Sequence, residues 1–580
     1  MDETSRPDGF EFDDFRLDAV ERILRRGGAA VPLTPRVFDT LLYFVRHHGR
    51  VLEKDELMRE IWPDAIVEEN NLTQNVSTLR QALGEAGGAR RYIVTIPGRG
   101  YRFAAHVRGS AAAADPAVAA AARTIAVLPF VNMSADTENE YFCDGLAEEL
   151  INALSKVEDL KVAARTSAFT FKGKDAHIGE IGQILGVNVV LEGSVRRSGD
   201  RLRVTAQLID AATGYHLWSE RYDRQMRDVF DLQDDIALAV VEALKITLLG
   251  GQKAAVLKHH TGNTEAYDLY LKGRYFWSRQ APQDFRKSRD YFQRAVEADP
   301  AYALGYCGLA FFHGFGSSWG FIPPDAGWPQ AEAAASKALA LDPTLGEAHL
   351  ALAALKMVSD RDWPTSEREL GRAIALNPKL AEVHSVRGLF QRARGQFDEA
   401  IAEGRRALQL DPLSVRFARN LAGTYYFARR YDESTRLYLD ALEFDPNNVP
   451  LLQDLGDVYE RKGMFDDAIA AWQKAYALTG GASFASAMPG IHAAEGFGAV
   501  VRASGEFTLR RLEGRAHAGE YVPSIDYVRA YMKLGNTERA LAWLEKACEE
   551  RNAFALFIST DPAFDTLRQD SRFVALAPAL

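Results

Sequence analysis

Cysteine is scarce in this chain, with 3 among its 580 residues. Cys143, Cys307 and Cys548 lie in separate segments, without the Cys or His neighbours of a zinc site. This pattern argues against a disulfide framework and favours small buried side chains in a reducing, cytoplasmic compartment. The polar first residues also lack the apolar stretch of a signal peptide. We therefore expect no metal and no cofactor.

Long apolar runs are also rare. Tyr302–Ile322 holds few charges, but it contains His313 and several glycines, so it does not predict a membrane span. Apolar residues make up 47% of the chain and charged residues 26%, as in soluble globular proteins. The length suggests roughly four domains. The net charge of −10 argues against a polyanion binder that uses the whole chain.

Catalytic motifs are missing as well. The sequence has no HExxH, no GxSxG and no protein-kinase signature, and the glycine-flanked segment 193–199 lacks the lysine of a phosphate-binding loop. Asp144, Glu148 and Glu149 share one predicted helix, but carboxylates on a helix surface are usually solvated. We predict that the protein is not an enzyme. A nucleotide-handling enzyme that uses this middle segment is the less favoured alternative.

The chain does contain a predicted β-hairpin at Tyr92–Phe103. A β-branched run leads into a tight turn at Pro97–Gly100, and a second short strand follows. The glycines can adopt positive φ, which lets the ribbon reverse sharply. Arg99 stands at the tip of this turn, where its guanidinium could meet a phosphate or enter a minor groove.

A helix with two distinct faces is predicted just before this hairpin, from Glu69 to Leu83. Leu72, Val76, Leu79 and Leu83 form its apolar face, and amides and hydroxyls form the opposite face. Amide side chains both donate and accept, as an adenine edge in the major groove requires. The alternative is an ordinary solvated face. The predicted DNA-contacting residues of helix and hairpin are Asn70, Asn71, Gln74, Asn75, Thr78, Arg80, Thr95, Arg99, Gly100, Tyr101 and Arg102.

The segments upstream complete a small domain over residues 10–105. Thr34 is a predicted N-cap, and Pro35 starts a helix that buries Val37, Phe38, Leu41, Leu42 and Val45. A second helix is predicted from about Glu53 to Trp62. Short strands are expected around residues 10–12, 15–17 and 23–24.

This order of elements resembles the OmpR/PhoB-type winged helix-turn-helix domain. The matching stretches are Leu33–Arg36, Arg50–Leu57, Ile61–Pro63, Asn75–Arg80 and Tyr92–Phe103. The resemblance implies that the Glu69–Leu83 helix enters the major groove while the hairpin touches the minor groove or backbone. Members often carry a basic residue where this chain has Ser77 and Thr78, and arginine where it has Pro97. Base preference therefore cannot be transferred.

The position of this domain in the chain is similar to that in the CadC/ToxR-like group. With the domain starting near residue 10, we expect no receiver domain before it. Members of that group often continue into a membrane span, whereas residues 109–122 form an Ala-rich predicted linker. In the wider family the loop after the second helix can touch RNA polymerase. Here its acidic residues Asp64, Glu68 and Glu69 would suit a basic partner, although a merely soluble loop fits equally well.

The middle segment, residues 124–250, is predicted to be an α/β domain with strands around 124–130, 160–164, 187–195, 201–209 and 214–222. Its helices are expected near 141–155, 178–185 and 229–248. The stretches 126–130, 142–146, 191–195 and 217–222 resemble the TolB amino-terminal-like domain. That module occurs beside tetratricopeptide arrays in bacterial regulators and in some adenylate cyclases.

The carboxy-terminal half contains an internal repeat. Asp-Pro or Asn-Pro dipeptides begin at residues 299, 342, 377, 411 and 445, in steps of 43, 35, 34 and 34 residues. A period of 34 residues resembles the tetratricopeptide repeat, which pairs two helices. The long first step predicts an insertion around Gly316–Pro329. The array is predicted over 264–580, with divergent helices at 483–520 and a tail near 560–573 that caps the last apolar face.

The predicted protein is thus a multidomain, bacterial-type transcriptional regulator. Its predicted parts are a winged helix-turn-helix domain (1–108), a linker (109–123), an α/β domain (124–250) and an all-α tetratricopeptide superhelix (264–580). The expected partners are double-stranded DNA, RNA polymerase, an unknown protein or peptide in the repeat groove and a second copy of the chain in a homodimer. The main alternative is a tetratricopeptide interaction scaffold that does not read DNA.

Overall fold

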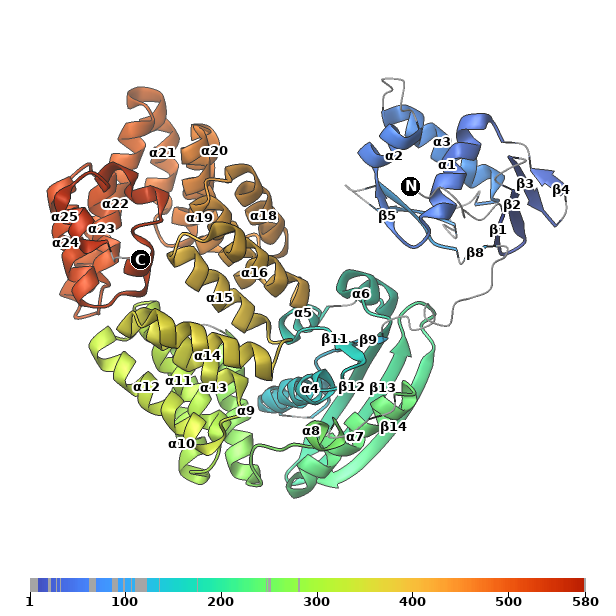
Figure 1. Cartoon of the computed structure of the whole chain (residues 1–580), viewed down its shortest axis with the longest axis horizontal. Coiled ribbons are helices and arrows are strands. Elements are labelled where there is room, and N and C mark those ends of the chain that lie inside the picture. Colours follow the sequence, from blue (N-terminus) through green and yellow to red (C-terminus); the bar gives the residue numbers. More distant parts are fainter. Residues whose placement is uncertain are drawn as a thin grey trace. The chain divides into compact units, whose positions relative to one another are not determined.

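The chain folds into two compact units, Met1–Ala121 and Ala122–Leu580, which are described separately (Figure 1). The computed structural model describes residues 9–18, 22–27, 29–31, 33–61, 69–85, 92–96, 100–105, 107–109, 123–134, 136–174, 176–246, 248, 252–279 and 282–577. Residues 110–122 of the predicted linker (109–123), the hairpin tip at 97–99 and the loop at 62–68 lie outside this description.

The first unit begins with an antiparallel sheet. Its strand order is β4-β3-β2-β1-β8, so a hairpin meander is closed by a short strand from the end of the unit. The expected early strands are confirmed, and the strands are β1 (Gly9–Phe12), β2 (Phe15–Asp18), β3 (Ile23–Arg26), β4 (Ala29–Val31) and β8 (Arg108–Gly109). Phe12, Phe15 and Phe103 fill the space between this sheet and the rest of the unit.

Three helices and a second sheet complete the first unit. The helices are α1 (Pro35–Arg46), α2 (Lys54–Ile61) and α3 (Glu69–Ala82), as the sequence predicts. The second sheet has the order β5-β7-β6, from β5 (Val51–Glu53), β6 (Ile93–Ile96) and β7 (Gly100–Phe103). The hairpin β6–β7 confirms the predicted ribbon, whereas β5 was not predicted. Thr34 precedes α1, but its side chain makes no capping hydrogen bond.

The second unit starts with the α/β domain, whose sheet has the order β11-β9-β12-β13-β14, with β10 beside β12 (Figure 1). The strands are β9 (Arg123–Val127), β10 (Val131–Asn132), β11 (Leu160–Val162), β12 (Val189–Ser198), β13 (Arg201–Asp210) and β14 (His216–Gln225). The helices are α4 (Glu140–Ser155), α5 (Arg165–Phe169), α6 (Ile178–Leu185), α7 (Val229–Ala243) and α8 (Gln252–Val256). The predicted final helix was too long, because Lys245 adopts a left-handed φ of 53° just beyond α7.

The rest of the second unit is a stack of antiparallel helix pairs, which confirms the tetratricopeptide prediction (Figure 1). Small residues allow close helix contact, and a Cβ at Gly456 would lie 2.3 Å from Trp472 Nε1. The helices are α9 (Thr264–Arg279), α10 (Pro282–Ala298), α11 (Ala303–Ser318), α12 (Pro324–Leu341), α13 (Gly346–Leu355), α14 (Trp363–Leu376), α15 (Ala381–Ala393), α16 (Phe397–Leu410), α17 (Val415–Phe427), α18 (Tyr431–Phe444), α19 (Val449–Lys462), α20 (Phe465–Leu478), α21 (Ala482–Glu495), α22 (Phe497–His517), α23 (Ser524–Lys533) and α24 (Thr537–Glu549).

The insertion predicted around Gly316–Pro329 lengthens one helix pair. Helices α11 and α12 have 16 and 18 residues, compared with 13 and 14 in α15 and α16. The link between α11 and α12 reaches the far end of the array, because a Cβ at Gly320 would lie 2.1 Å from the Pro523 side chain that precedes α23. The superhelix therefore closes on itself.

The α/β domain and the repeats share one hydrophobic core. Leu146 of α4, Ile236 of α7 and Phe292 of α10 belong to the same buried cluster. The repeat turns add polar contacts. Lys379 Nζ donates to the carbonyl oxygens of Ser155, Val157 and Leu160 at the end of α4, each at 3.1 Å. The α/β domain is thus fixed against the repeats.

A second repeat turn holds α5 in the same way. The Ser167 N–H and Oγ both donate to the Asp411 carboxylate, at 3.1 and 2.5 Å, and Leu413 N–H donates back to Ser167 Oγ at 2.9 Å. Ser167 and Asp411 are both buried. Two of the dipeptides that set the repeat period begin at Asp411 and at Asn377, and the Asn377 dipeptide is followed directly by Lys379. The repeat turns that contain these dipeptides therefore also bind the α/β domain.

Candidate nucleic-acid interface and repeat groove

Helix α3 packs one face on the core of the first unit and shows another to solvent. Leu72, Val76, Leu79 and Leu83 are buried, as predicted. The exposed residues among those described are Thr73, Ser77 and Gln81, spaced four residues apart on one helical stripe. The predicted contact residues Asn75 and Thr78 flank this stripe and are half-buried. Asn70, Asn71 and Gln74 also lie on α3, but their side chains are outside the described part.

Asn75 points toward α1 rather than along the exposed stripe. Its Nδ2 donates to Thr40 Oγ1 at 3.1 Å, and Thr40, which is fully buried, donates to the Arg36 carbonyl at 2.7 Å. One amide hydrogen of Asn75 therefore joins α3 to α1. A role for Asn75 in base contact stays a prediction, and it would have to use the rest of the amide.

Arg80 connects the end of α3 to the hairpin. Its Nη2 donates to the Ile93 carbonyl at 2.9 Å and to Thr95 Oγ1 at 2.7 Å, so the two predicted contact residues Arg80 and Thr95 are partners. Arg80 Nε lies 3.8 Å from a carboxylate oxygen of Glu85, whose side chain is 2% exposed. Glu85 in turn accepts hydrogen bonds from the backbone N–H groups of Tyr92 and Ile93. This cluster fixes the orientation of the hairpin relative to α3.

The described residues of the hairpin mainly contact other residues of the first unit. A Cβ at Gly100 would lie 2.0 Å from the Leu52 carbonyl oxygen, so the pairing of β5 with β7 requires glycine there. Tyr101 is 5% exposed and meets the Phe44 ring in an edge contact. Arg102 is half-buried on the other face of β7. Of the remaining predicted contacts, Arg99, Asp64 and Glu68 lie outside the described residues, and Glu69 starts α3.

The sequence prediction therefore identified α3 and its buried face but omitted part of its exposed surface. Thr73, Ser77 and Gln81 were not among the predicted contacts. Their four-residue spacing was visible in the sequence, and it marks the side of the helix opposite Leu72, Val76 and Leu79. The prediction instead selected residues by their amide chemistry. The structure shows that the exposed side of α3 is centred near Ser77.

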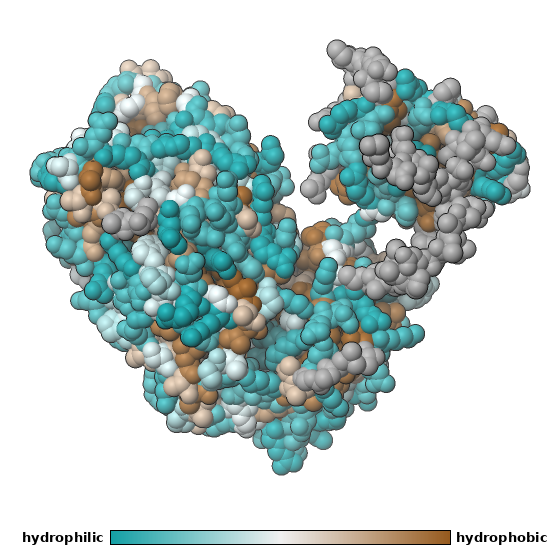
Figure 2. Space-filling view, in the orientation of Figure 1, coloured by the Kyte–Doolittle hydropathy of each residue, from teal (hydrophilic) through white to brown (hydrophobic). Residues whose placement is uncertain are grey.

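A cavity of about 2590 Å³ lies in the second unit between the α/β domain and the repeats. Its wall includes Glu149 of α4, Glu347 of α13, Glu382 of α15 and Arg419 of α17. The first helices of successive repeat pairs thus line it, as expected for the concave side of a tetratricopeptide array. The visible surface of this unit is largely hydrophilic with scattered hydrophobic patches (Figure 2).

Two of the three predicted carboxylates of α4, Asp144 and Glu148, are not solvated, so that expectation was wrong for them, whereas Glu149 is half-buried. Asp144 is 6% exposed and Glu148 is 8% exposed, because the repeats cover this helix. Lys172 Nζ binds both Asp144 oxygens, at 2.6 and 2.7 Å. Glu148 pairs with Arg165 Nε at 2.9 Å and with Arg274 of α9. Although burial alone would raise the pKa of Glu148, these two guanidinium groups lower it.

The segment after α24 packs against the middle of the array and then caps its end. Leu556 and Phe557, in the 3-10 helix η4 (Ala553–Phe557), join the buried cluster of α13 and α15. The Arg392 guanidinium lies between the rings of Phe427 and Phe557, at 4.5 and 4.4 Å from their centroids. Burial lowers the pKa of Arg392 to about 10. The predicted cap is confirmed in η5 (Pro562–Leu567) and α25 (Ser571–Leu576), where Phe564 and Phe573 cover α23 and α24.

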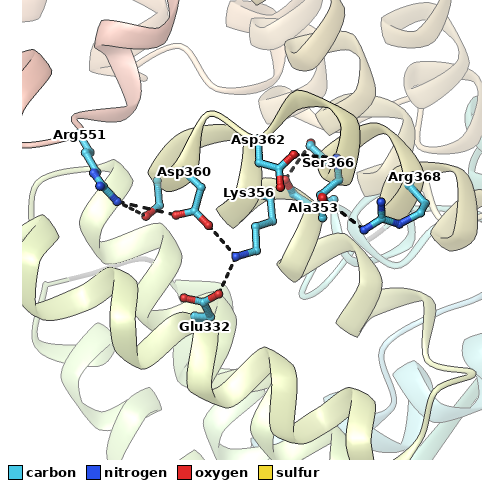
Figure 3. A network of polar contacts seen from close by, with 10 residues as sticks. Glu332, Ala353, Lys356, Asp360, Asp362, Ser366, Arg368 and Arg551 are labelled. Carbon is cyan, nitrogen blue, oxygen red and sulfur yellow. Dashed lines mark hydrogen bonds and ion pairs between the residues drawn. The ribbon is translucent and has the colours of Figure 1, made fainter.

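Charged contacts fasten the same segment (Figure 3). Arg551, just after α24, points to Asp360 at 3.8 Å, and Lys356 Nζ binds both Asp360 and Glu332 at 2.6 Å. Lys356 and Asp360 belong to η3 (Lys356–Asp360), a π-helical turn after α13. Further along, Arg429 makes two hydrogen bonds to Asp565, at 2.7 and 2.9 Å. The segment after α24 is thus held against the earlier repeats by ion pairs.

Comparison with known proteins agrees with this domain order. Residues 28–103 match the family described as "Transcriptional regulatory protein, C terminal", which is the OmpR/PhoB-type domain. Residues 121–239 match "HilA/YgeH-like transcriptional regulator, second domain", and residues 437–470 and 526–554 match tetratricopeptide repeats. The winged helix-turn-helix and tetratricopeptide predictions are confirmed. The TolB amino-terminal-like assignment of the middle domain stays a prediction.

Three curated proteins illustrate the similarity. A putative adenylate cyclase 3 of Rhizobium meliloti is 40% identical over 249 residues, which are 42% of this chain and 41% of that protein. The transcriptional regulator HilA of Salmonella typhi is 23% identical over 304 residues, 52% of each chain. The transcriptional activator CadC of Escherichia coli is 38% identical over 81 residues, 14% of this chain and 16% of CadC. The chain thus spans about half or less of these relatives.

Proposed function

We propose that this protein is a transcriptional regulator that binds DNA through its first unit, with α3 in the major groove and the β6–β7 hairpin beside it. The observation that carries this proposal is the polar stripe of α3, exposed next to a hairpin that Arg80 and Glu85 hold in place. The regulator families matched by residues 28–103 and 121–239 support it. Binding to bacterial DNA would place its action in the cytoplasm.

The alternatives make different predictions. An interaction scaffold would leave DNA of any sequence unbound. A nucleotide-handling enzyme is suggested by the name of the Rhizobium meliloti relative, although only 41% of that protein is matched. Within the described residues, no group of three or more His, Cys, Asp or Glu side chains could hold a metal ion. Full-length protein incubated with ATP and a divalent cation, followed by chromatography of the products, would reveal cyclase activity.

The first test selects DNA sequences with the full-length protein and then measures binding to the selected sites. Ser77→Asp places a negative charge in the middle of the exposed α3 stripe, so it should weaken binding to the selected site on the order of tenfold. Ala30→Asp, which adds the same charge on exposed β4, serves as the matched control and should bind like the parent. Equal affinity of both variants would place the DNA surface elsewhere or exclude it.

The second test concerns the proposed polymerase contact at Asp64, Glu68 and Glu69. Replacing all three by Ala should leave operator affinity unchanged but lower transcription in vitro, because acidic side chains suit a basic partner surface. Replacing exposed Glu53 and Glu60 of the same unit by Ala controls for the loss of two of these three charges. If transcription at full operator occupancy stays at the parent level, the loop only aids solubility.

The repeat groove is the proposed docking site for a protein or peptide signal. Its support is the 2590 Å³ cavity lined by first helices of the repeats together with the α/β domain. Because the α/β domain shares the repeat core, a partner in this groove would contact both. None of the described helices has the length and apolar character needed to cross a membrane.

A further inference from the structure

Strand β14 forms one edge of the α/β sheet (Figure 1). It pairs with β13 from His216 to Gln225, with a register shift between Leu208 and Ile209 that leaves Leu217 out of the ladder. Among the strands in the described part of the chain, β13 is its sole partner. A ten-residue edge strand presents a row of backbone N–H and C=O groups that a further strand can pair with. The irregularity at Leu217 lies near the start of the strand, so the stretch from Trp218 to Gln225 remains a continuous edge that a further strand can join.

The charges along this edge are symmetric about Tyr222. The order Glu220, Arg221, Tyr222, Asp223, Arg224 places each charge at the same distance from Tyr222 as a charge of opposite sign. Arg221 and Asp223 point to the open face of the sheet, where they are 67% and 53% exposed. Glu220, which accepts a hydrogen bond from Tyr222 at 3.0 Å, shares the other face with Arg224.

We propose that β14 pairs in antiparallel fashion with β14 of a second copy of this chain, with Tyr222 of both copies on the two-fold axis. In this register Arg221 faces Asp223 of the second copy, and Glu220 faces Arg224 of the second copy. Asp223 already binds Arg203 of β13 at 2.8 Å. It would then lie between two arginines, which continues an alternating row of charge across the joined sheets.

Other registers are less favourable for the same reason. A two-fold axis perpendicular to the sheet joins the two sheets with their equivalent faces on the same side. Each residue of one copy then lies opposite a residue of the other copy that is an even number of positions away in the sequence. Moving the axis by one residue places Arg221 or Asp223 opposite its own copy, and moving it by two places Glu220 or Arg224 there. Like charges directly opposite each other are destabilising. Among the five positions from Glu220 to Arg224, Tyr222 is the one that avoids every such contact.

This dimer does not depend on DNA binding, but it would add to the proposed function. Two first units joined through one dimer would place two α3 helices on the same duplex, and the second contact would profit from a high effective concentration.

The test uses sedimentation and cross-linking of the full-length protein. Ser219→Cys with Gln225→Cys puts two exposed thiols directly opposite each other across the proposed axis, so mild oxidation should give a covalent dimer. Within one chain these positions are about 20 Å apart along the strand, too far for a disulfide. Each single variant is the matched control. In the proposed dimer its two thiols, one from each copy, would lie about 20 Å apart. A single variant would also reveal any cross-link through the native cysteines.

A charge reversal gives an independent measurement. Arg221→Glu should weaken the dimer about tenfold in sedimentation equilibrium, since both copies would place Glu opposite Asp223. Binding to a single half-site should stay at the parent level, which separates this proposal from the proposed DNA function. A parent protein that stays monomeric at every concentration would overturn the proposal. The proposal would also be overturned if the variant with Leu217→Cys and Gln225→Cys formed the cross-link and the variant with Ser219→Cys and Gln225→Cys did not, because the first cross-link places Arg221 on the axis.

Discussion

Replacing Arg80 by Met should lower the free energy of unfolding of the first unit by about 3 kcal/mol. The change removes the hydrogen bonds to the Ile93 carbonyl and to Thr95, and it leaves the buried Glu85 carboxylate without its cation. Methionine replaces the apolar stem of the arginine side chain, so lost packing contributes little. Hydrogen exchange of the full-length protein, followed by mass spectrometry, would measure this as faster exchange in residues 35–105 with no change beyond residue 123.

The same variant distinguishes two roles for Arg80. The sequence predicts that Arg80 contacts DNA. If it binds a phosphate, its loss would lower the slope of log affinity against log salt concentration by about one, without faster exchange in the first unit. The structure favours a link between α3 and the hairpin. Arg59→Met, at an exposed position of α2, should leave exchange unchanged and serves as the control. Unchanged exchange in Arg80→Met, together with a reduced salt slope, would restore the sequence interpretation.

Replacing Glu149 by Gln should stabilise the second unit above pH 7 by up to about 3 kcal/mol. Burial, followed by repulsion from Glu148, raises the pKa of the Glu149 carboxyl from its usual value near 4.5 to about 7. The folded state therefore favours the protonated acid. The contribution of this protonated carboxyl to the stability of the folded state is complete below pH 4.5 and is lost as the pH rises through 7. Glutamine keeps the shape of the protonated acid and has no such loss.

Urea unfolding at pH 5 and pH 8 measures this difference. The parent should lose stability relative to the variant between these values, whereas Glu180→Gln, on the exposed face of α6, should follow the parent at both. Parallel unfolding curves for parent and Glu149→Gln across this range would mean that the cavity solvates Glu149 well enough to keep it ionised.

The parts of the fold set by local pattern could be predicted from the sequence. The spacing of Leu72, Val76, Leu79 and Leu83 identified both α3 and its buried face, because a helix places such residues on one stripe. The repeat helices were predictable for the same reason, since each pair repeats one local pattern. The short strand β5 was not, because three residues carry too little periodicity and pair with β7 far along the chain.

The partners of polar side chains were harder to predict. Asn75 and Arg80 were assigned to DNA by residue type, but Thr40 and Ile93, which bind them, come close only after the unit has folded. Glu148 was expected to be solvated because its own helix gave no sign of burial. The covering residue Arg274 lies on another helix more than a hundred positions later. Such contacts depend on tertiary packing, which local periodicity does not encode.

The closure of the array has a consequence for synthesis on the ribosome. Phe557 fills a site formed by residues around Phe390 and Phe427, so that site stays open until Phe557, more than a hundred residues after Phe427, has been translated. The α/β domain likewise remains incomplete until Phe292 and Asp411 have emerged. Contacts of such long sequence separation form slowly, and the nascent chain exposes apolar helix faces meanwhile. The second unit is therefore expected to depend on chaperones during translation more than an open repeat array of equal length, in which each helix pair is covered as soon as the next one appears.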